Sequence, residues 1–293
     1  MQPIIQCENV THYYGERCIY ENLSFEVQRG RVLGLLGKNG TGKTTIINIL
    51  NGFLKPVAGT CRLFGEEMEQ LSPHTKSKIG LLLEGHVQHD FFTVQQIEKY
   101  YSNFFKNWKR EAYYELLKKL QVLPTQKLSS MSCGQRSQVA LGLLLAQDPE
   151  LLILDDFSMG LDPGYRHLFV DYLREFAASG DKTIFLTSHI IQDMEQLVDE
   201  CIILDYGRIL LHAKTDHIMR NFRKYSFLLG PGLSPVHHQE LWSTDHIGSR
   251  WETYSFLPPE EVKALVSVAH PVDDFRMNPL TLEEAFIGLT GKY

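Results

Sequence analysis

The spacing of apolar residues divides the chain into strand-like and helix-like stretches. Residues 4–30 alternate apolar and polar positions on both sides of Tyr14-Gly15, which predicts two strands joined by a turn. Short uninterrupted apolar runs predict buried strands, and they occur at residues 32–36, 79–83, 151–154, 183–187 and 201–204. Helical segments lie between these runs, as a parallel sheet covered by helices requires. The pattern therefore predicts an α/β fold.

One long stretch interrupts this alternation. From residue 93 to residue 120, apolar side chains recur at helical spacing. Residues 135–146 continue as a further apolar helix. We therefore expect a helical lobe, at about residues 87–149, inserted into the domain that carries the sheet.

The composition changes again after about residue 214, where Gly-Pro-Gly and Leu-Pro-Pro sequences interrupt the chain. We expect one large domain over residues 3–215. We expect a small α+β domain over residues 217–293, which ends in a helix near residues 281–289.

Composition and charge exclude several classes of protein. The 293 residues carry a net charge of −6 without a long block of like charge, so we expect no nucleic acid as a partner. The five cysteines contain no C-x-x-C pair, which argues against a disulfide framework or a zinc site and favours reduced thiols in the cytoplasm. No signal peptide is visible, and no apolar run reaches the roughly 18 to 20 residues that span a bilayer. If the protein works at a membrane, another component must hold it there.

The most specific motif reads Gly-Lys-Asn-Gly-Thr-Gly-Lys-Thr and lies between a predicted strand and a predicted helix. Its spacing is that of a phosphate-binding loop. The glycines let backbone amides converge on a phosphate, the second lysine reaches the β- and γ-phosphates, and the last hydroxyl binds Mg²⁺. The nucleotide-binding residues expected here are Gly37, Lys38, Asn39, Gly40, Thr41, Gly42, Lys43, Thr44 and Thr45. The motif predicts a bound nucleoside triphosphate with Mg²⁺.

Two further elements accompany this loop. The apolar run at residues 151–154 ends in Asp155, which places that carboxylate at the carboxyl edge of a buried strand, where ligands collect in open α/β sheets. There Asp155 would hold Mg²⁺ through water, beside Thr44. Upstream, Ser132 is suited to cap a helix and Gly134 would let a phosphate approach the backbone, although in isolation this segment indicates only a helix cap.

Together these motifs resemble those of the ATP-binding subunit of ABC transporters, over about residues 3 to 215. Met131-Ser132-Cys133-Gly134-Gln135 resembles the LSGGQ signature of this family, altered at its first and third positions. Leu161-Asp162 matches the D-loop, Thr187-Ser188-His189 matches the switch histidine, and Tyr14 matches the aromatic residue that stacks on adenine. The appended segment, with Leu282-Glu283-Glu284-Ala285-Phe286, is similar to the tail of ATPases in type-2, exporter-like systems, with YtrB-like or bacitracin-type subunits as the nearest group.

The resemblance implies a P-loop NTPase core: a RecA-like parallel sheet with an N-terminal antiparallel β subdomain, the inserted helical lobe and the small C-terminal domain. It implies that two subunits, identical or different, pack head to tail around two ATP–Mg²⁺. Each ATP would lie between the phosphate loop of one subunit and the signature helix of the other. It also implies an ATPase at the inner, cytoplasmic face of the cell membrane, which powers a separate transmembrane permease, an exporter.

The resemblance also assigns roles to individual residues. Asp156, His189 and Glu84 would be catalytic, and Thr44, Asp155 and Glu84 would hold the metal. Tyr14 would stack on adenine. The residues that complete the site of the other subunit would be Ser132, Gly134, Gln135 and Asp162.

Two of these positions depart from the family pattern. Asp156 stands where the family usually has a glutamate as general base for the attacking water. Aspartate is one methylene shorter, and a displacement near 1 Å can cost on the order of 10²-fold in rate, so we expect a competent but slowed base. Glu84 stands where the family has a glutamine that touches Mg²⁺ and the lytic water, and a carboxylate can still ligate the metal.

The loop between Glu84 and Phe92 joins the nucleotide site to the helical lobe, so we expect the permease to contact it. The aromatic residues of the lobe are expected mostly in its core, namely Tyr100, Tyr101, Phe104, Phe105 and Trp108. Two alternatives remain. One is a weakly hydrolysing regulatory cassette in a heterodimeric transporter, which Asp156 and the altered signature motivate. The other is a soluble ABC ATPase that takes no part in transport.

Overall fold

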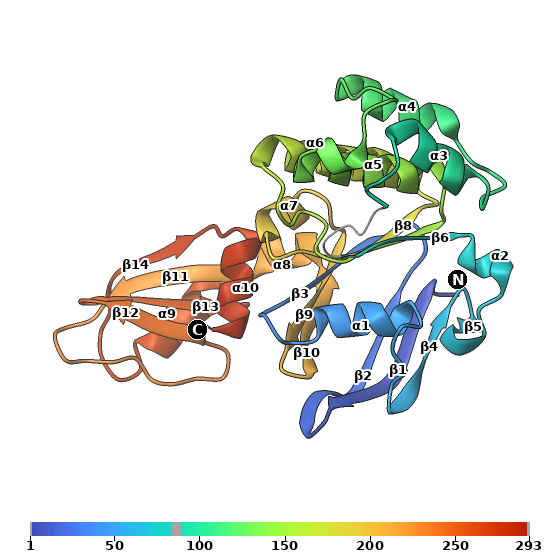
Figure 1. Ribbon diagram of the computed structural model, residues 1–293. Coiled ribbons are helices and arrows are strands. Elements are labelled where there is room, and N and C mark those ends of the chain that lie inside the picture. The colour runs from blue at the N-terminus through green and yellow to red at the C-terminus, as the bar shows by residue number, and fades with distance from the viewer. Residues whose placement is uncertain (1, 84–88, 292–293) are drawn as a thin grey trace. The chain divides into compact units, whose positions relative to one another are not determined.

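The computed structural model describes residues 2–83 and 89–291 (Figure 1). The chain divides into two compact units, Met1–Ile209 and Leu210–Tyr293. In the described part of the chain, no helix is both long and apolar enough to cross a membrane.

A six-stranded sheet with the strand order β10-β9-β3-β8-β7-β6 forms the centre of the first unit. These strands are β3 (Val32–Gly37), β6 (Ile79–Leu82), β7 (Leu151–Leu154), β8 (Thr183–Thr187), β9 (Glu200–Asp205) and β10 (Arg208–Lys214). β3 runs parallel to both β8 and β9, and β7 runs parallel to β6 and β8. All residues of β7 and β8 are buried, which explains the apolar sequence of β7 and of the centre of β8. The predicted α/β fold is confirmed.

A second, antiparallel sheet contains the N-terminal strands, in the order β2-β1-β4-β5. Its strands are β1 (Ile5–Tyr14), β2 (Arg17–Val27), β4 (Ala58–Leu63) and β5 (Glu66–Glu67). The turn between β1 and β2 contains Gly15 at φ 61°, a conformation that suits glycine. A buried cluster joins this sheet to the central sheet and to helix α1 (Lys43–Leu50), through residues such as Leu33, Ile46 and Phe185.

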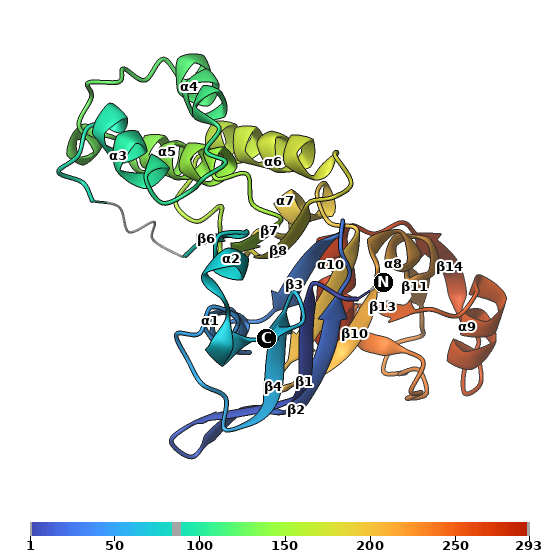
Figure 2. The ribbon, with the colours of Figure 1, turned by 90° about the vertical axis from the view of Figure 1, so that its right-hand side faces the viewer.

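Helices α3 (Val94–Ser102), α4 (Arg110–Lys119) and α5 (Cys133–Ala146) form a lobe (Figure 1). In Figures 1 and 2 the lobe and the antiparallel sheet lie at opposite ends of the first unit. The expected helical stretch at residues 93–120 is thus two helices, separated at residues 103–109. The buried carboxylate of Glu98 ties them together by accepting hydrogen bonds from Trp108 Nε1 at 2.8 Å and Arg110 Nε at 3.1 Å.

The expectation that the lobe aromatics are mostly core is wrong at two positions. Tyr101 and Trp108 pack against the lobe core. Tyr100 is 42 % exposed and Phe104 is 63 % exposed. Helical spacing identifies a face of apolar side chains, but the surrounding structure decides whether a neighbour covers that face.

Short elements connect these parts, namely η1 (Met68–Gln70), α2 (Pro73–Lys76), η2 (Leu128–Ser130) and α7 (Ile191–Glu195). A longer helix, α6 (Pro163–Ala177), lies between β7 and β8 in the chain. This helix begins at Asp162, whose carboxylate accepts a hydrogen bond from the Tyr165 amide at 3.1 Å and caps the helix.

The second unit contains a four-stranded antiparallel sheet, in the order β12-β13-β11-β14. Its elements are α8 (Thr215–Asn221), β11 (Arg223–Leu228), β12 (Trp242–Ile247), β13 (Arg250–Ser255), α9 (Pro259–Val266), β14 (Asp273–Asn278) and α10 (Leu282–Thr290). Tyr225, Phe227 and Val262 belong to its core. The last helix begins at Thr281, which forms a capping box with Glu284.

Candidate nucleotide site

A cavity of about 510 Å³ opens where β3, β7 and β8 end. It is lined by Tyr14, Arg17, Ile19, Asn39, Gly40, Gly42, Lys43, Thr44, Thr45, Asp155, Asp156, Met159, Thr187, Ser188 and His189. Because parallel strands bring their carboxyl ends to one edge of the sheet, residues more than a hundred positions apart meet here. The cavity unites most of the residues that the sequence predicted for the nucleotide and the metal.

The phosphate loop connects β3 to α1. Gly40 and Gly42 have φ of 79° and 102°, values that favour glycine. The Lys43 ammonium donates to the carbonyl oxygens of Gly37 at 2.6 Å and Lys38 at 3.1 Å. Burial lowers the pKa of Lys43, whereas the nearby charges of Asp156 and Asp155 oppose this shift. In this structure Lys43 is therefore held within the loop, close to both aspartates.

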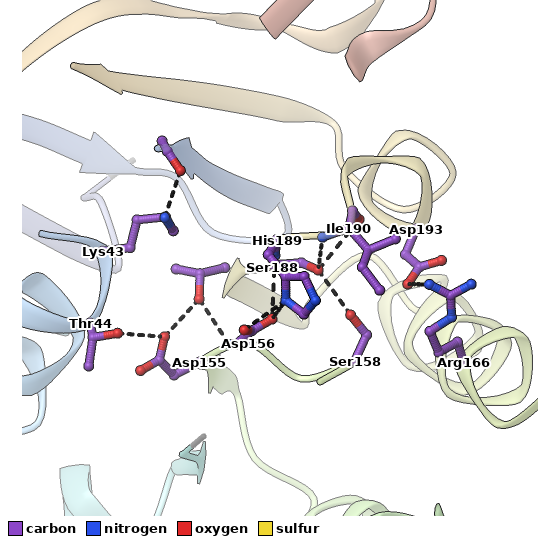
Figure 3. Close-up of polar contacts among 12 residues, drawn as sticks. Lys43, Thr44, Asp155, Asp156, Ser158, Arg166, Ser188, His189, Ile190 and Asp193 are labelled. Atoms are coloured by element: carbon purple, nitrogen blue, oxygen red, sulfur yellow. Dashed lines mark hydrogen bonds and ion pairs between the residues drawn. The ribbon is translucent and has the colours of Figure 1, made fainter. Parts of the chain in front are cut away.

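Asp155 lies beside the loop, directly after β7 (Figure 3). Its Oδ1 accepts hydrogen bonds from Thr187 Oγ1 at 2.8 Å and from Thr44 Oγ1 at 3.4 Å. Its side chain is buried, and desolvation together with the charge of Asp156 raises its pKa, which the two hydroxyl donors only partly offset.

The donor set at this point fits Mg²⁺. A carboxylate and a hydroxyl oxygen are hard ligands, and Mg²⁺ is usually held by one or two protein oxygens together with waters and substrate phosphates. Among the described residues, no group of three or more His, Cys, Asp or Glu side chains is placed so that it could hold a metal ion. The residues present therefore fit a metal ion that arrives with the nucleotide.

The side chains of Asp156 and His189 contact each other in the lining of the cavity (Figure 3). The imidazole Nδ1 lies 2.7 Å from Asp156 Oδ1 and 2.8 Å from Oδ2. The Asp156 backbone amide donates to Thr187 Oγ1 at 2.9 Å. Asp156 adopts φ 45°, in the left-handed region that aspartate tolerates better than most residues. The backbone thus turns so that the carboxylate faces the histidine across the end of the sheet.

Tyr14 lines the cavity and is 50 % exposed, with its ring edge-on to His12 at 5.0 Å between centroids. The exposed part of the Tyr14 ring is compatible with stacking on an adenine base. Glu84, the remaining predicted catalytic and metal residue, lies outside the described residues.

The signature residues lie outside this cavity. Ser132 caps α5, and its Oγ accepts from the Gln135 amide at 3.2 Å while the Gln135 side chain accepts from the Ser132 amide at 3.2 Å. A Cβ on Gly134 would lie 2.5 Å from Cδ2 of Tyr165. The Tyr165 ring, from the first turn of α6, therefore occupies the space that a side chain at position 134 would need. The structure brings Ser132, Gly134, Gln135 and Asp162 together around the starts of α5 and α6, away from the phosphate loop of the same chain.

The sequence analysis missed two residues that contact the phosphate loop. Arg17 donates to the Gly40 carbonyl at 3.0 Å, and the Tyr20 hydroxyl donates to the Gly42 carbonyl. No local motif identifies them, because both contacts depend on how β2 packs against the loop more than twenty residues later.

Comparison with protein families adds independent support. A family model described as ABC transporter matches residues 20–158. The Nod factor export ATP-binding protein I of Cupriavidus metallidurans is 30 % identical, and the alignment covers 100 % of this chain and 99 % of that protein. Its counterpart in Ralstonia nicotianae is 33 % identical over 99 % of this chain and 94 % of that protein.

Solved structures show the same fold at lower identity. An ATP-binding subunit of an ABC transporter superposes with a TM-score of 0.66 at 23 % identity, covering 74 % of this chain and 92 % of that one. A dimeric ATP-binding cassette with bound ADP and phosphate has a TM-score of 0.63 at 21 % identity, covering 72 % and 98 %. Since its relatives match it from end to end, the chain belongs to the ABC transporter family as one of its ATP-binding subunits, and these subunits are ATPases.

Proposed function

We propose that this ATPase works as one of two subunits that close around two ATP–Mg²⁺ and thereby power a separate membrane permease, an exporter. The observation that carries the proposal is the meeting of Lys43, Thr44, Asp155, Asp156 and His189 on one cavity. Phosphoryl transfer to water requires positioning and charge neutralisation more than covalent chemistry, and these groups supply both.

The inner half of the cavity binds the triphosphate. The loop amides and Lys43 hold the β- and γ-phosphates, and Tyr14 stacks on adenine. Thr44 and Asp155 would hold Mg²⁺, which would neutralise charge on the phosphate oxygens, and Glu84 is proposed as a further ligand. Lys43 then exchanges its bonds to the Gly37 and Lys38 carbonyls for phosphate oxygens.

The outer half of the cavity provides the acid–base groups. Asp156 accepts the proton of the attacking water, and His189 holds the γ-phosphate and that water. The two side chains bond to each other, so this contact must loosen before Asp156 can receive a water. The short reach of aspartate and this competing bond both support the proposal of a slow hydrolysis step.

The start of α5 serves the second subunit. Ser132, Gly134 and Gln135 lie at the N-terminus of a 14-residue helix, where the helix dipole favours a phosphate. These residues and Asp162 do not reach the phosphate loop of their own chain. This separation supports a head-to-tail pair of subunits, in which α5 of one chain covers the nucleotide of the other.

The permease would dock on the helical lobe, near the loop that leads from the nucleotide site. His89, Phe91, Tyr100 and Phe104 lie at this end of the lobe, and the last three are 66 %, 42 % and 63 % exposed. Attachment through this surface would place the protein at the inner face of the cell membrane. The relatives named as export proteins support an exporter. We further propose that residues 3–215 are the ATP-binding domain and that residues 217–293 are an accessory domain.

Steady-state ATPase measurements on the purified protein test this proposal. We expect Mg²⁺-dependent hydrolysis that Asp156→Asn reduces at least 100-fold while ATP binding stays within twofold. A wild-type rate equal to that of Asp156→Asn would instead support the regulatory cassette of a heterodimeric transporter, which the Asp156–His189 contact also favours. Recovery of the protein with ribosomes rather than membranes would support a non-transport ATPase.

A further inference from the structure

Strand β2 contacts the phosphate loop through two side chains that belong to no nucleotide-binding motif. The Arg17 guanidinium donates to the Gly40 carbonyl at 3.0 Å, and the Tyr20 hydroxyl donates to the Gly42 carbonyl. Arg17 is exposed and lines the cavity, whereas Tyr20 is completely buried. Both side chains thus contact the backbone of the loop.

Gly42 is fitted tightly against this strand. It has φ 102°, and a Cβ at this position would meet the Tyr20 hydroxyl and would lie 2.7 Å from Cγ2 of Ile19. A side chain at Gly42 would therefore displace the loop from β2 as well as strain the backbone. The left-handed conformation and the contact with Tyr20 are parts of one packing arrangement.

The hydrogen bond from Tyr20 fixes the direction of one peptide plane. The Gly42 carbonyl also accepts the Ile46 amide at 3.0 Å, in the first turn of α1. In a trans peptide the carbonyl and the following amide point in opposite directions. A Gly42 carbonyl held between Tyr20 and α1 therefore directs the Lys43 amide away from them, toward the end of the helix where a phosphate binds.

Tyr20 is suited to hold this plane at any physiological pH. Burial raises the pKa of its phenol far above the ordinary value, so the hydroxyl stays neutral and remains a donor. Its ring belongs to the core shared by the antiparallel sheet and α1, so the position of the hydroxyl is set by packing on all sides.

We propose that Tyr20, assisted by Arg17, is a positioning residue that holds the phosphate loop in its binding conformation before the nucleotide arrives. This inference rests on the proposed ATP site. Preorganisation lowers the ordering cost of binding, so its loss weakens affinity while the reacting groups stay in place. The effect appears in Kd and KM for ATP, and kcat changes little.

The test compares Tyr20→Phe with Tyr113→Phe. Tyr113 is a matched control, because it is also completely buried and its hydroxyl also donates to a backbone carbonyl, that of Val94 at 2.9 Å, but in the helical lobe. We expect Tyr20→Phe to raise the Kd for a non-hydrolysable ATP analogue with Mg²⁺ about three- to tenfold, in line with the loss of one buried neutral hydrogen bond. Calorimetric titration measures Kd, and thermal unfolding of both variants measures their stability.

Equal affinity of Tyr20→Phe and the wild type would overturn the proposal, and so would an equal loss of affinity in Tyr113→Phe. If Tyr20→Phe does not fold, Arg17→Gln tests the same arrangement at Gly40, because Arg17 is exposed. We expect this variant to raise the Kd two- to fivefold, and an unchanged Kd would contradict the proposal. A wild-type protein that binds no analogue would instead contradict the proposed function, which separates the two failures.

Discussion

The imidazole of His189 lies between both carboxylate oxygens of Asp156, with its Nδ1 2.7 and 2.8 Å from them. In the proposed mechanism, this pair would position the attacking water. The left-handed backbone of Asp156 and the bond from its amide to Thr187 set this geometry. The two side chains therefore act as a unit, and the strength of their contact influences how readily the base becomes available.

Lengthening Asp156 by one methylene tests whether reach limits the rate. We expect Asp156→Glu to raise kcat about tenfold, because a longer side chain can place its carboxylate nearer to the γ-phosphate. KM for ATP should change less than twofold, since the phosphate loop is untouched. The rate of phosphate release as a function of Mg²⁺–ATP concentration measures both kcat and KM. A kcat of Asp156→Glu at or below that of the wild type would show that the loop has adapted to aspartate.

Asp155 is expected to lower the stability of the nucleotide-free protein. Burial raises its folded pKa above the ordinary value, so its charge is disfavoured in the folded state. This destabilisation is present at neutral pH and disappears as the pH falls through the folded pKa, where the carboxylate takes up a proton. Asp155→Asn should therefore raise the unfolding temperature by about 1–3 °C at pH 7.5 and by less at acid pH.

The same substitution should abolish Mg²⁺-dependent ATP binding, so stability and function change in opposite directions. Differential scanning fluorimetry across pH gives the first quantity and calorimetric titration the second. Asp216→Asn is a suitable control, because that side chain is 82 % exposed and should not alter either. A lower unfolding temperature of Asp155→Asn at neutral pH would contradict the argument.

Much of the fold could be predicted because its signals are local. Strand β7 is buried on both faces and is apolar throughout, and β8 carries an apolar centre between two buried threonines. The phosphate loop needs glycines at positive φ. The capping box of Ser132 and Gln135 likewise lies within four residues. Each of these features leaves its mark on a short stretch of sequence.

Other features depend on contacts between distant segments. The bond from Tyr20 to Gly42 spans 22 positions, and the contact of Asp156 with His189 spans 33. The exposure of Phe104 depends on what covers the lobe, which helical periodicity does not encode. Motif spacing and the family resemblance therefore predicted the groups that would touch the nucleotide, but not the residues that position them.

Gly134 allows a packing role to be separated from a phosphate role. A methyl group there would lie 2.5 Å from the Tyr165 ring, so Gly134→Ala should destabilise the protein by about 1–3 kcal/mol through overpacking. Adding Tyr165→Ala relieves that collision. Ser130→Ala, a substitution at an exposed residue nearby, is the control for stability.

The proposed phosphate contact makes a different prediction for activity. If α5 approaches the nucleotide of a second subunit through Gly134, ATP hydrolysis should stay at least tenfold reduced in the double variant, even where its unfolding temperature recovers relative to Gly134→Ala. Activity that returns together with stability would show that Gly134 serves only to accommodate Tyr165. Thermal unfolding and ATPase rates of the three variants distinguish the two roles.

The exposed aromatic row on the lobe should govern attachment to the membrane partner. The Phe91 and Phe92 ring centroids are 4.5 Å apart. The row continues from Phe92 through Tyr100 to Phe104, and the ring centroids of Tyr100 and Phe104 are 5.2 Å apart. Replacing Phe91 and Phe104 with serine removes apolar surface that a docked helix would cover. We expect the membrane-bound fraction to fall at least fivefold in cells that produce the protein together with its permease, with the ATPase rate of the purified protein within twofold of wild type.

Ile247→Ser is the control, because Ile247 lies in the second unit and is 82 % exposed; it should leave the membrane-bound fraction unchanged. Retention of the Phe91/Phe104 double variant on membranes would place the docking surface elsewhere on the chain.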